Sequence, residues 1–441
     1  MAHAAKGTLD ARRCPRTFSK IMRPTRVRAE DTSRRLDDWR KLPVQPWGNK
    51  ATIVDEVVRN QVYVLEQQLG VFDVAVNIRM TALVIDGGIA LVNTLAPTQE
   101  CLSFVQELEE KHGAIKYIIL PTTQLEHKIY LKSFSDTFPD ANIWVTDKQW
   151  SFPPFAELVG YFPSKIDGYL SSENDKYPWK DDLDIRVLDI NLPGSIPTPF
   201  QEAAIFHRSS ESLVVTDAVV RVGRDPPKIV KEDPTSLLTI AGVWPSEGGG
   251  ADRDSRDASV NTPNNQRLGW AKTALLALFL SPEAVSKDLG EYLSKGFVWA
   301  DGWESTFEAV NSRELLVSPL VSELVFRPQA SKVWNWVQDV TKWKFKRVIP
   351  SHFDIATRAG PEEFRNAFRF LAGEDEQEIP KEKAPWEEFI SSITQRKEKE
   401  AEILEKTSDG YITSIPGTSQ GDFEVLRFIA KSAFGDKALE K

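Results

Sequence analysis

The chain has only two cysteines, Cys14 and Cys101, among 441 residues. Two isolated thiols provide no disulfide framework, no Cys-x-x-Cys pair and no thiolate zinc site, which suits a reducing compartment. Long apolar runs are missing as well. The best candidates, residues 213–222 and 273–280, are too short for the roughly 20 residues of a membrane-spanning helix or carry charge. These absences exclude a disulfide-stapled scaffold and argue against a transmembrane segment.

Positive charge is also in short supply. The net charge is −9 and the pI is near 5.4, so a broad nucleic-acid surface is not expected, because phosphate binding needs basic patches. The common enzyme motifs are lacking: there is no P-loop, no Rossmann fingerprint, no Gly-x-Ser-x-Gly and no His-Glu-x-x-His. With 41% hydrophobic and 27% charged residues, the composition is that of a soluble globular protein.

Residues 1–29 differ from the rest of the chain. They contain two lysines and six arginines against one acid, Asp10. An Arg-rich, acid-poor start is typical of an organelle transit peptide. The alternative interpretation is a disordered basic tail on a cytosolic protein.

The first half of the chain shows strand and helix patterns in a clear order. Residues 81–85 and 89–92 predict a hairpin around Asp86-Gly87-Gly88. Residues 98–112 predict a helix that Thr98 caps and Gly113 ends. A strand (114–120), a short helix (129–138) and another strand (141–146) follow. Residues 52–68 mix helix and strand signals.

The second half of the chain also contains both strand and helix patterns. Strands are predicted at 184–188 and 347–350, a hairpin at 203–207 and 212–215, and a flexible insertion at 246–267. Helices are predicted at 271–289, with an interruption near Pro282, and at 304–317, 330–343 and 361–372. This order predicts a four-layer αββα sandwich, an α/β (α+β) fold, over residues 47–372. Residues 373–441 form a charged helical extension, with a run dense in Glu and Lys at 374–407 and an amphipathic helix at 423–434; its partner is left open.

The segment Pro121 to His127 directly follows the apolar strand pattern of residues 117–120. It resembles the metallo-β-lactamase signature, histidine-x-histidine-x-aspartate-histidine. Thr122 and Gln124 occupy the positions of the first two histidines, Glu126 replaces the aspartate, and His127 keeps the last histidine. The sandwich fold and a site at this strand end are what the resemblance implies.

Two further side chains follow predicted strands. Asp217 comes after residues 213–215, where the resembling fold has its bridging aspartate, and His352 comes after residues 348–350, where it has its final histidine. By this resemblance, Glu126, His127, Asp217 and His352 belong to the second of two metal sites, and the first site has lost its ligands. Two imidazoles and two carboxylates suit one zinc, iron or manganese ion, with positions left for water of lowered pKa.

Several interpretations stay open. Because Glu is longer than Asp, Glu126 either binds the ion or fixes the tautomer of His127. His127 and Asp217 alternatively hold two loops together without metal. The protein is then either a mononuclear hydrolase of an ester, thioester or phosphoester, with Thr122 or Gln124 contacting a small-molecule substrate, or a metal-free scaffold or binding protein. Redox chemistry at iron is a weaker third option, since no flavin-binding domain is visible.

A closer resemblance covers residues 47–371. Stretches of the chain resemble an uncharacterised family of cyanobacteria, algae and plants known as domain of unknown function 4336. The resemblance implies a metallo-β-lactamase-like fold, a photosynthetic lineage and hence a chloroplast or plastid leader, but no substrate. The stretches that carry it are 79–81, 96–101, 125–128, 150–153, 215–218 and 349–353.

Overall fold

The computed structural model describes residues 32–35, 50–71, 73–150, 162–163, 165–192, 198–243, 257–288, 296–372 and 413–434. The predicted leader (1–29), the first part of the predicted insertion (246–256) and the charged run at 374–407 lie outside the described residues. Within the described part, no helix has the length and apolar character needed to cross a membrane.

The first sheet has seven strands in sequence order. Neighbours from β1 to β4 are antiparallel, and those from β4 to β7 are parallel. The predicted hairpin around Asp86-Gly87-Gly88 is confirmed as the turn between β3 and β4, with Gly87 at a φ of 71° that favours glycine. The strands are β1 (Ile53–Val58), β2 (Val62–Val71), β3 (Val74–Ile85), β4 (Gly88–Val92), β5 (Ile115–Leu120), β6 (Asn142–Val145) and β7 (Gly168–Tyr169).

The second sheet has four strands in the order β11-β10-β9-β8. Strands β8, β9 and β10 are antiparallel, whereas β10 and β11 are parallel, with Val214 opposite Ile349. This parallel pair brings the residues after both strands to the same edge. The strands are β8 (Leu183–Leu192), β9 (Thr198–His207), β10 (Ser212–Val214) and β11 (Arg347–Ile349).

The two sheets pack face to face through the apolar residues on their inner faces. Their strands carry apolar residues on the outer faces as well. In β2, Val62 and Val64 face the second sheet, while Tyr63 and Leu65 face outward. Ile205 of β9 and the facing residues of the second sheet complete this inner core. Strands that are apolar on both faces need cover on both faces, and helices provide it.

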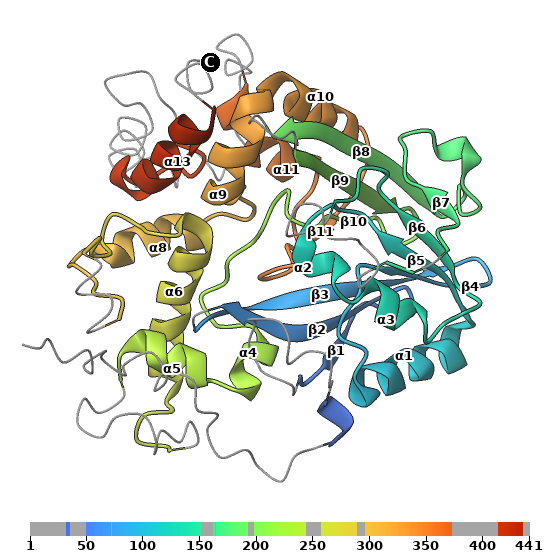
Figure 1. The fold of residues 1–441 in the computed structure, drawn as a ribbon, viewed down its shortest axis with the longest axis horizontal. Helices are drawn as coiled ribbons and strands as arrows, with labels where there is room; N and C mark the ends of the chain where they lie inside the picture. Colours follow the sequence, from blue (N-terminus) through green and yellow to red (C-terminus); the bar gives the residue numbers. More distant parts are fainter. Residues whose placement is uncertain are drawn as a thin grey trace, which may run out of the picture.

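Helices α1 and α3 cover the outer face of the first sheet, and α10 and α11 cover that of the second (Figure 1). The predicted four-layer αββα sandwich is therefore confirmed. Thr98 caps α1 by accepting from the N–H of Cys101, as predicted. The helices around the sheets are η1 (Thr32–Arg34), α1 (Gln99–His112), α2 (Leu125–Lys128), α3 (Leu131–Ser135), η4 (Asn174–Lys176), α10 (Ala330–Val340), α11 (Pro361–Ala367) and η7 (Arg369–Leu371).

A further group of helices packs against the ends of β2 and β3 (Figure 1). Here three predicted boundaries are wrong. Helix α6 begins at Pro263, inside the predicted insertion, and it ends at Phe279, so that residues 283–288 are not helical as predicted. The helix predicted at 304–317 ends at Asn311. The elements of this part are α4 (Lys228–Glu232), α5 (Thr235–Ala241), α6 (Pro263–Phe279), α8 (Trp303–Asn311), α9 (Pro319–Val321), η5 (Ser322–Phe326), η6 (Arg327–Gln329), η9 (Gly421–Phe423) and α13 (Glu424–Phe434).

Candidate metal centre

The loop after β5 carries Glu126 and His127 on the short helix α2. This loop is tied to the second sheet, because the N–H of Ala203 donates to the carbonyl of Pro121 at 2.7 Å and Thr122 forms a β-bridge with Glu202. Helix α2 therefore begins where the first sheet meets β9. His127 is fully buried, and Glu126 is partly exposed.

Asp217 lies on the loop that leaves β10, and a buried carboxylate shapes this loop. Glu202 of β9 accepts from the backbone N–H groups of Thr216 (2.9 Å), Asp217 (3.1 Å) and Ala218 (3.0 Å). Burial, followed by repulsion from Asp217, raises the pKa of Glu202 to about 7. Three N–H donors on one carboxylate fix the backbone at Asp217 and thus the starting point of its side chain.

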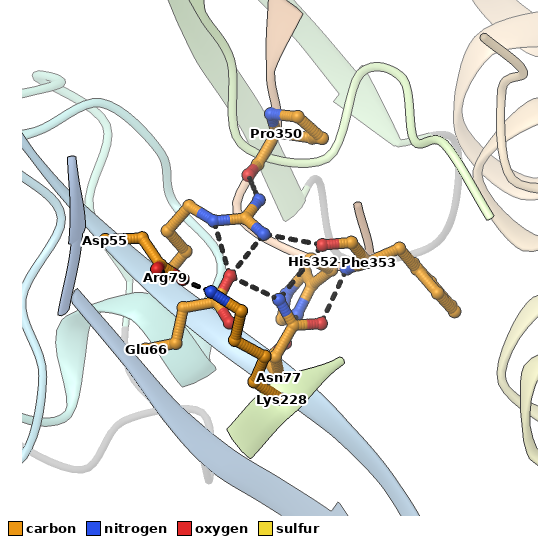
Figure 2. Close-up of polar contacts among 8 residues, drawn as sticks. All are labelled: Asp55, Glu66, Asn77, Arg79, Lys228, Pro350, His352 and Phe353. Carbon is orange, nitrogen blue, oxygen red and sulfur yellow. Dashed lines mark hydrogen bonds and ion pairs between the residues drawn. The ribbon is translucent and has the colours of Figure 1, made fainter. Parts of the chain in front are cut away.

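His352 lies on the loop after β11, which three side chains of β2 and β3 hold (Figure 2). The ring Nδ1 of His352 lies 2.8 Å from the carbonyl of Asn77. A carbonyl only accepts, so Nδ1 carries the proton and Nε2 has a free lone pair. This is the tautomer in which Nε2 can bind a metal.

These residues come together. One ligand atom from each of Glu126, His127, Asp217 and His352 lies within 4.8 Å of all the others. His127 Nε2 is 3.5 Å from Asp217 Oδ2, and His352 Nε2 is 3.6 Å from Asp217 Oδ1. The Asp217 carboxylate therefore stands between the two imidazoles, whose ring centroids are 5.1 Å apart.

The pKa values of His127, Asp217 and His352 are shifted by burial and by the proximity of the carboxylate to the two imidazoles. Burial is the largest single effect and acts to lower the pKa of His127, but the contact with Asp217 and the charges of Asp217, Glu126 and Glu202 together leave this pKa raised. Burial dominates at His352, whose pKa is lowered. At Asp217 burial acts to raise the pKa, but the two imidazoles reverse this and lower it. The carboxylate is thus kept charged, which a cation site requires.

The donor atoms fit a divalent cation better than they fit one another. Both ring nitrogens of His127 and Oδ2 of Asp217 are buried without a hydrogen-bond partner among the described residues. Distances of 3.5 and 3.6 Å are too long for N–H···O hydrogen bonds. Two ligands of one tetrahedral zinc ion, by contrast, lie about 3.4 Å apart. The cluster can hold a metal ion, although its widest separation of 4.8 Å exceeds that of a filled site.

Thr122 and Gln124, which we expected to contact substrate, occupy different environments. Thr122 is fully buried, and its hydroxyl accepts from the N–H of Gln124 at 3.2 Å. Gln124 is half-buried and precedes α2 in an extended conformation, without a side-chain capping bond. Gln124 is therefore the more accessible of the two, and a substrate contact by either residue stays a prediction.

Four residues that hold the loops were not predicted from the sequence, namely Glu66, Asn77, Arg79 and Glu202. Each is a polar residue at a buried strand position, where an apolar residue is expected. The remaining described histidines lie outside the cluster: His207 contacts the carbonyl of Val84 at 3.0 Å, and His112 contacts the hydroxyl of Tyr63 at 2.9 Å.

The chain belongs to the family described as domain of unknown function DUF4336, whose model matches residues 59–370. The matched range includes strands β2 and β3 and all four candidate ligands. No curated protein matches the chain in sequence.

Among solved structures, the chain is similar to several metal-dependent proteins. A metallo-β-lactamase from Pontibacter korlensis is 10% identical, with a TM-score of 0.35 over 72% of this chain and 99% of that one. DIM-1 metallo-β-lactamase is 9% identical, with a TM-score of 0.34 over 73% and 98%. The metal-soaked Flv1 flavodiiron core from Synechocystis sp. PCC6803 is 11% identical, with a TM-score of 0.38 over 73% and 61%.

Proposed function

We propose that this protein binds one divalent metal ion through Glu126, His127, Asp217 and His352. The observation that carries the proposal is the convergence of these side chains around Asp217. Both ring nitrogens of His127 and Oδ2 of Asp217 are buried there without a hydrogen-bond partner among the described residues. Imidazole and carboxylate donors suit zinc, iron or manganese. The lone pair of His352 Nε2 faces Asp217, so His352 can bind an ion without losing a proton.

We further propose that the protein is a hydrolase of an ester, thioester or phosphoester. When bound, a divalent ion supplies Lewis-acid chemistry that polarises a substrate oxygen or a water molecule. Around it, Glu202 fixes the loop of Asp217, and Gln124, being partly accessible, orients the substrate by hydrogen bonding. The buried position of His127 keeps bulk water away from one side of the cluster.

The alternative is a metal-free scaffold, in which a protonated His127 pairs with Asp217 and joins two loops. The raised pKa of His127 favours this alternative. However, His127 Nε2 and Asp217 Oδ2 are 3.5 Å apart, a distance that supports a shared ion more than a direct hydrogen bond.

Elemental analysis of the full-length protein distinguishes the two. After chelation and reloading with zinc, iron or manganese, we expect about one ion per chain. The double variant His127→Ala/His352→Ala should retain less than about a tenth of it, because two of four ligands are lost. His112→Ala, which changes a histidine outside the cluster, should bind like the wild type. Hydrolysis of model esters, thioesters and phosphoesters should disappear with the metal.

A substoichiometric metal content that the double variant does not alter would leave the scaffold interpretation. Full metal binding without hydrolysis of any of the three ester classes would remove the hydrolase proposal and keep the metal site.

A further inference from the structure

The inner face of the first sheet changes character along β2 and β3. Val62 and Val64 belong to the inner core, but the next inward-facing residue of β2 is Glu66, which is paired with Arg79 of β3. Asn77 lies two residues before Arg79 on β3, and its side chain is on the same face of the sheet. All three polar side chains are buried, with exposures of 7, 3 and 0% for Glu66, Arg79 and Asn77. Burying an ion pair is costly unless each group is satisfied.

These three residues, which we call the β2–β3 clamp, are satisfied by one another and by the loop after β11 (Figure 2). Arg79 Nε donates to Glu66 at 2.8 Å, and the Arg79 guanidinium also donates to the carbonyls of Pro350 and Phe353. Asn77 Nδ2 donates to Glu66 and to the carbonyl of Phe353, both at 3.0 Å. Asn77 Oδ1 accepts from the N–H of Phe353 at 2.7 Å.

The loop needs this support because Phe353 has a φ of 58°. This left-handed conformation is disfavoured for a non-glycine residue. Asn77 pairs both backbone groups of Phe353, as a neighbouring strand would do, and the Phe353 ring packs against Trp270 of α6 with ring centroids 5.6 Å apart. The conformation of the residue after His352 is therefore set by side chains of β3 and α6.

We propose that the β2–β3 clamp positions His352 and selects its tautomer, so that Nδ1–H donates to the carbonyl of Asn77 and Nε2 faces Asp217. The geometry that supports this is a pair of contacts on opposite sides of the ring: Nδ1 at 2.8 Å from Asn77 O, and Nε2 at 3.6 Å from Asp217 Oδ1. The consequence for metal binding rests on the proposed function. The tautomer itself does not, since it is a property of the metal-free chain.

The chain offers a matched control on the neighbouring strand β2. Gln67 is fully buried, faces the opposite side of β2, and makes three hydrogen bonds, to Thr52 and to both backbone groups of Ala96. Asn77 also makes three side-chain hydrogen bonds. Asn77→Ala and Gln67→Ala therefore remove equal numbers of buried hydrogen bonds, but only the first disturbs the loop of His352.

The test is nitrogen–proton correlation NMR of the histidine rings in the metal-free, full-length protein, with the His352 signals assigned by their loss in His352→Ala. We expect a protonated Nδ1 and an unprotonated Nε2 in the wild type and in Gln67→Ala, and a mixture of tautomers in Asn77→Ala. Zinc titration is the second readout: affinity should fall about 10- to 100-fold in Asn77→Ala and less than about threefold in Gln67→Ala.

If His352 keeps its wild-type tautomer in Asn77→Ala, or if its tautomer changes equally in Gln67→Ala, the proposed positioning of His352 by the β2–β3 clamp is wrong. If the wild type binds no zinc, the proposed function fails, and the tautomer measurement still decides the role of the clamp. If Asn77→Ala does not fold, Arg79→Lys replaces it. That variant keeps the charge beside Glu66 but lacks the planar fork that reaches both loop carbonyls, so the same mixture is expected.

Discussion

At the scale of single residues, a buried lysine contacts the backbone of β2, the strand that carries Glu66. Lys50 is fully buried, and its ammonium donates to the carbonyl of Gln68 at 2.7 Å, next to the strand of the β2–β3 clamp. Burial lowers the pKa of Lys50 to about 7, far below that of an exposed lysine. A group whose pKa differs this much between folded and unfolded chains makes stability depend on pH.

The sign of that dependence follows from proton binding. Above about pH 7 the unfolded chain binds a proton at Lys50 that the folded protein does not hold, so raising the pH towards 10.5 stabilises the fold. We expect a gain of up to about 1.4 kcal/mol per pH unit, and its loss in Lys50→Met. Urea denaturation of the metal-free protein at several pH values in this window checks it. Lys132→Met, at a partly exposed lysine, should keep the wild-type slope. An unchanged slope in Lys50→Met would reject the assignment.

The residues of the site were predictable only in part. A histidine or acid directly after an apolar strand is a local signal, and it pointed to Glu126, His127, Asp217 and His352. Glu66, Asn77 and Arg79 carried no comparable signal, because a polar residue within a strand reads as a break in alternation until the facing loop is known. The reason is physical: these side chains are stabilised by backbone groups more than 250 residues away in sequence, as for Asn77 and Phe353.

At the scale of elements, α6 shows how a local signal was overlooked. Thr262 caps the helix by accepting from the N–H of Asn265, and Pro263 occupies the first turn, where proline is favoured. The glycine- and Asp-rich stretch before it led us to extend the insertion to 267. Gly269 was also a poor helix signal, but the tertiary structure explains it: α6 and α5 approach so closely that a Cβ there would lie 2.0 Å from the carbonyl oxygen of Leu237.

Gly269→Ala is therefore expected to destabilise the protein, although alanine favours helices more than glycine does. The added methyl group forces α5 and α6 apart, which we expect to cost about 1–3 kcal/mol of unfolding free energy. The shift would also reach Trp270, which packs against Phe353 beside His352. Urea denaturation measures the change. A variant as stable as the wild type would show that the two helices separate freely.

At the scale of the whole molecule, the fold extends beyond the part matched by the family. The family model ends at residue 370, yet residues 413–434 pack back onto the domain. Ile415 and Phe423 belong to the same hydrophobic cluster as Trp270 and Phe353. Asp422 accepts from the N–H of Glu283 and from the hydroxyl of Thr306, both at 3.0 Å. The predicted amphipathic helix at 423–434 is confirmed as α13, and it supports the helices behind the site.

Two phenylalanines of this segment provide a paired test. Phe423 is fully buried against Phe279, whereas Phe428 is 71% exposed. We expect Phe423→Ala to lower the unfolding free energy by about 3–5 kcal/mol, the usual cost of a cavity in a core. Phe428→Ala should change it by no more than about 0.5 kcal/mol. Thermal and urea denaturation of both variants give the comparison. Equal, small effects would mean that the segment is only loosely attached.

The sequence by itself determined the strands from β3 onward except β7, the hairpin around Gly87, the cap of α1 and the presence of ligand-type side chains after three strands. These features depend on periodicity and on contacts between near neighbours, which any short segment already contains. Only the tertiary structure decided that the four candidate ligands meet, that His352 presents Nε2 to Asp217, and that Gly269 is required. Each of these depends on the pairing of distant segments, such as β10 with β11, and that pairing is set by burying the whole core at once.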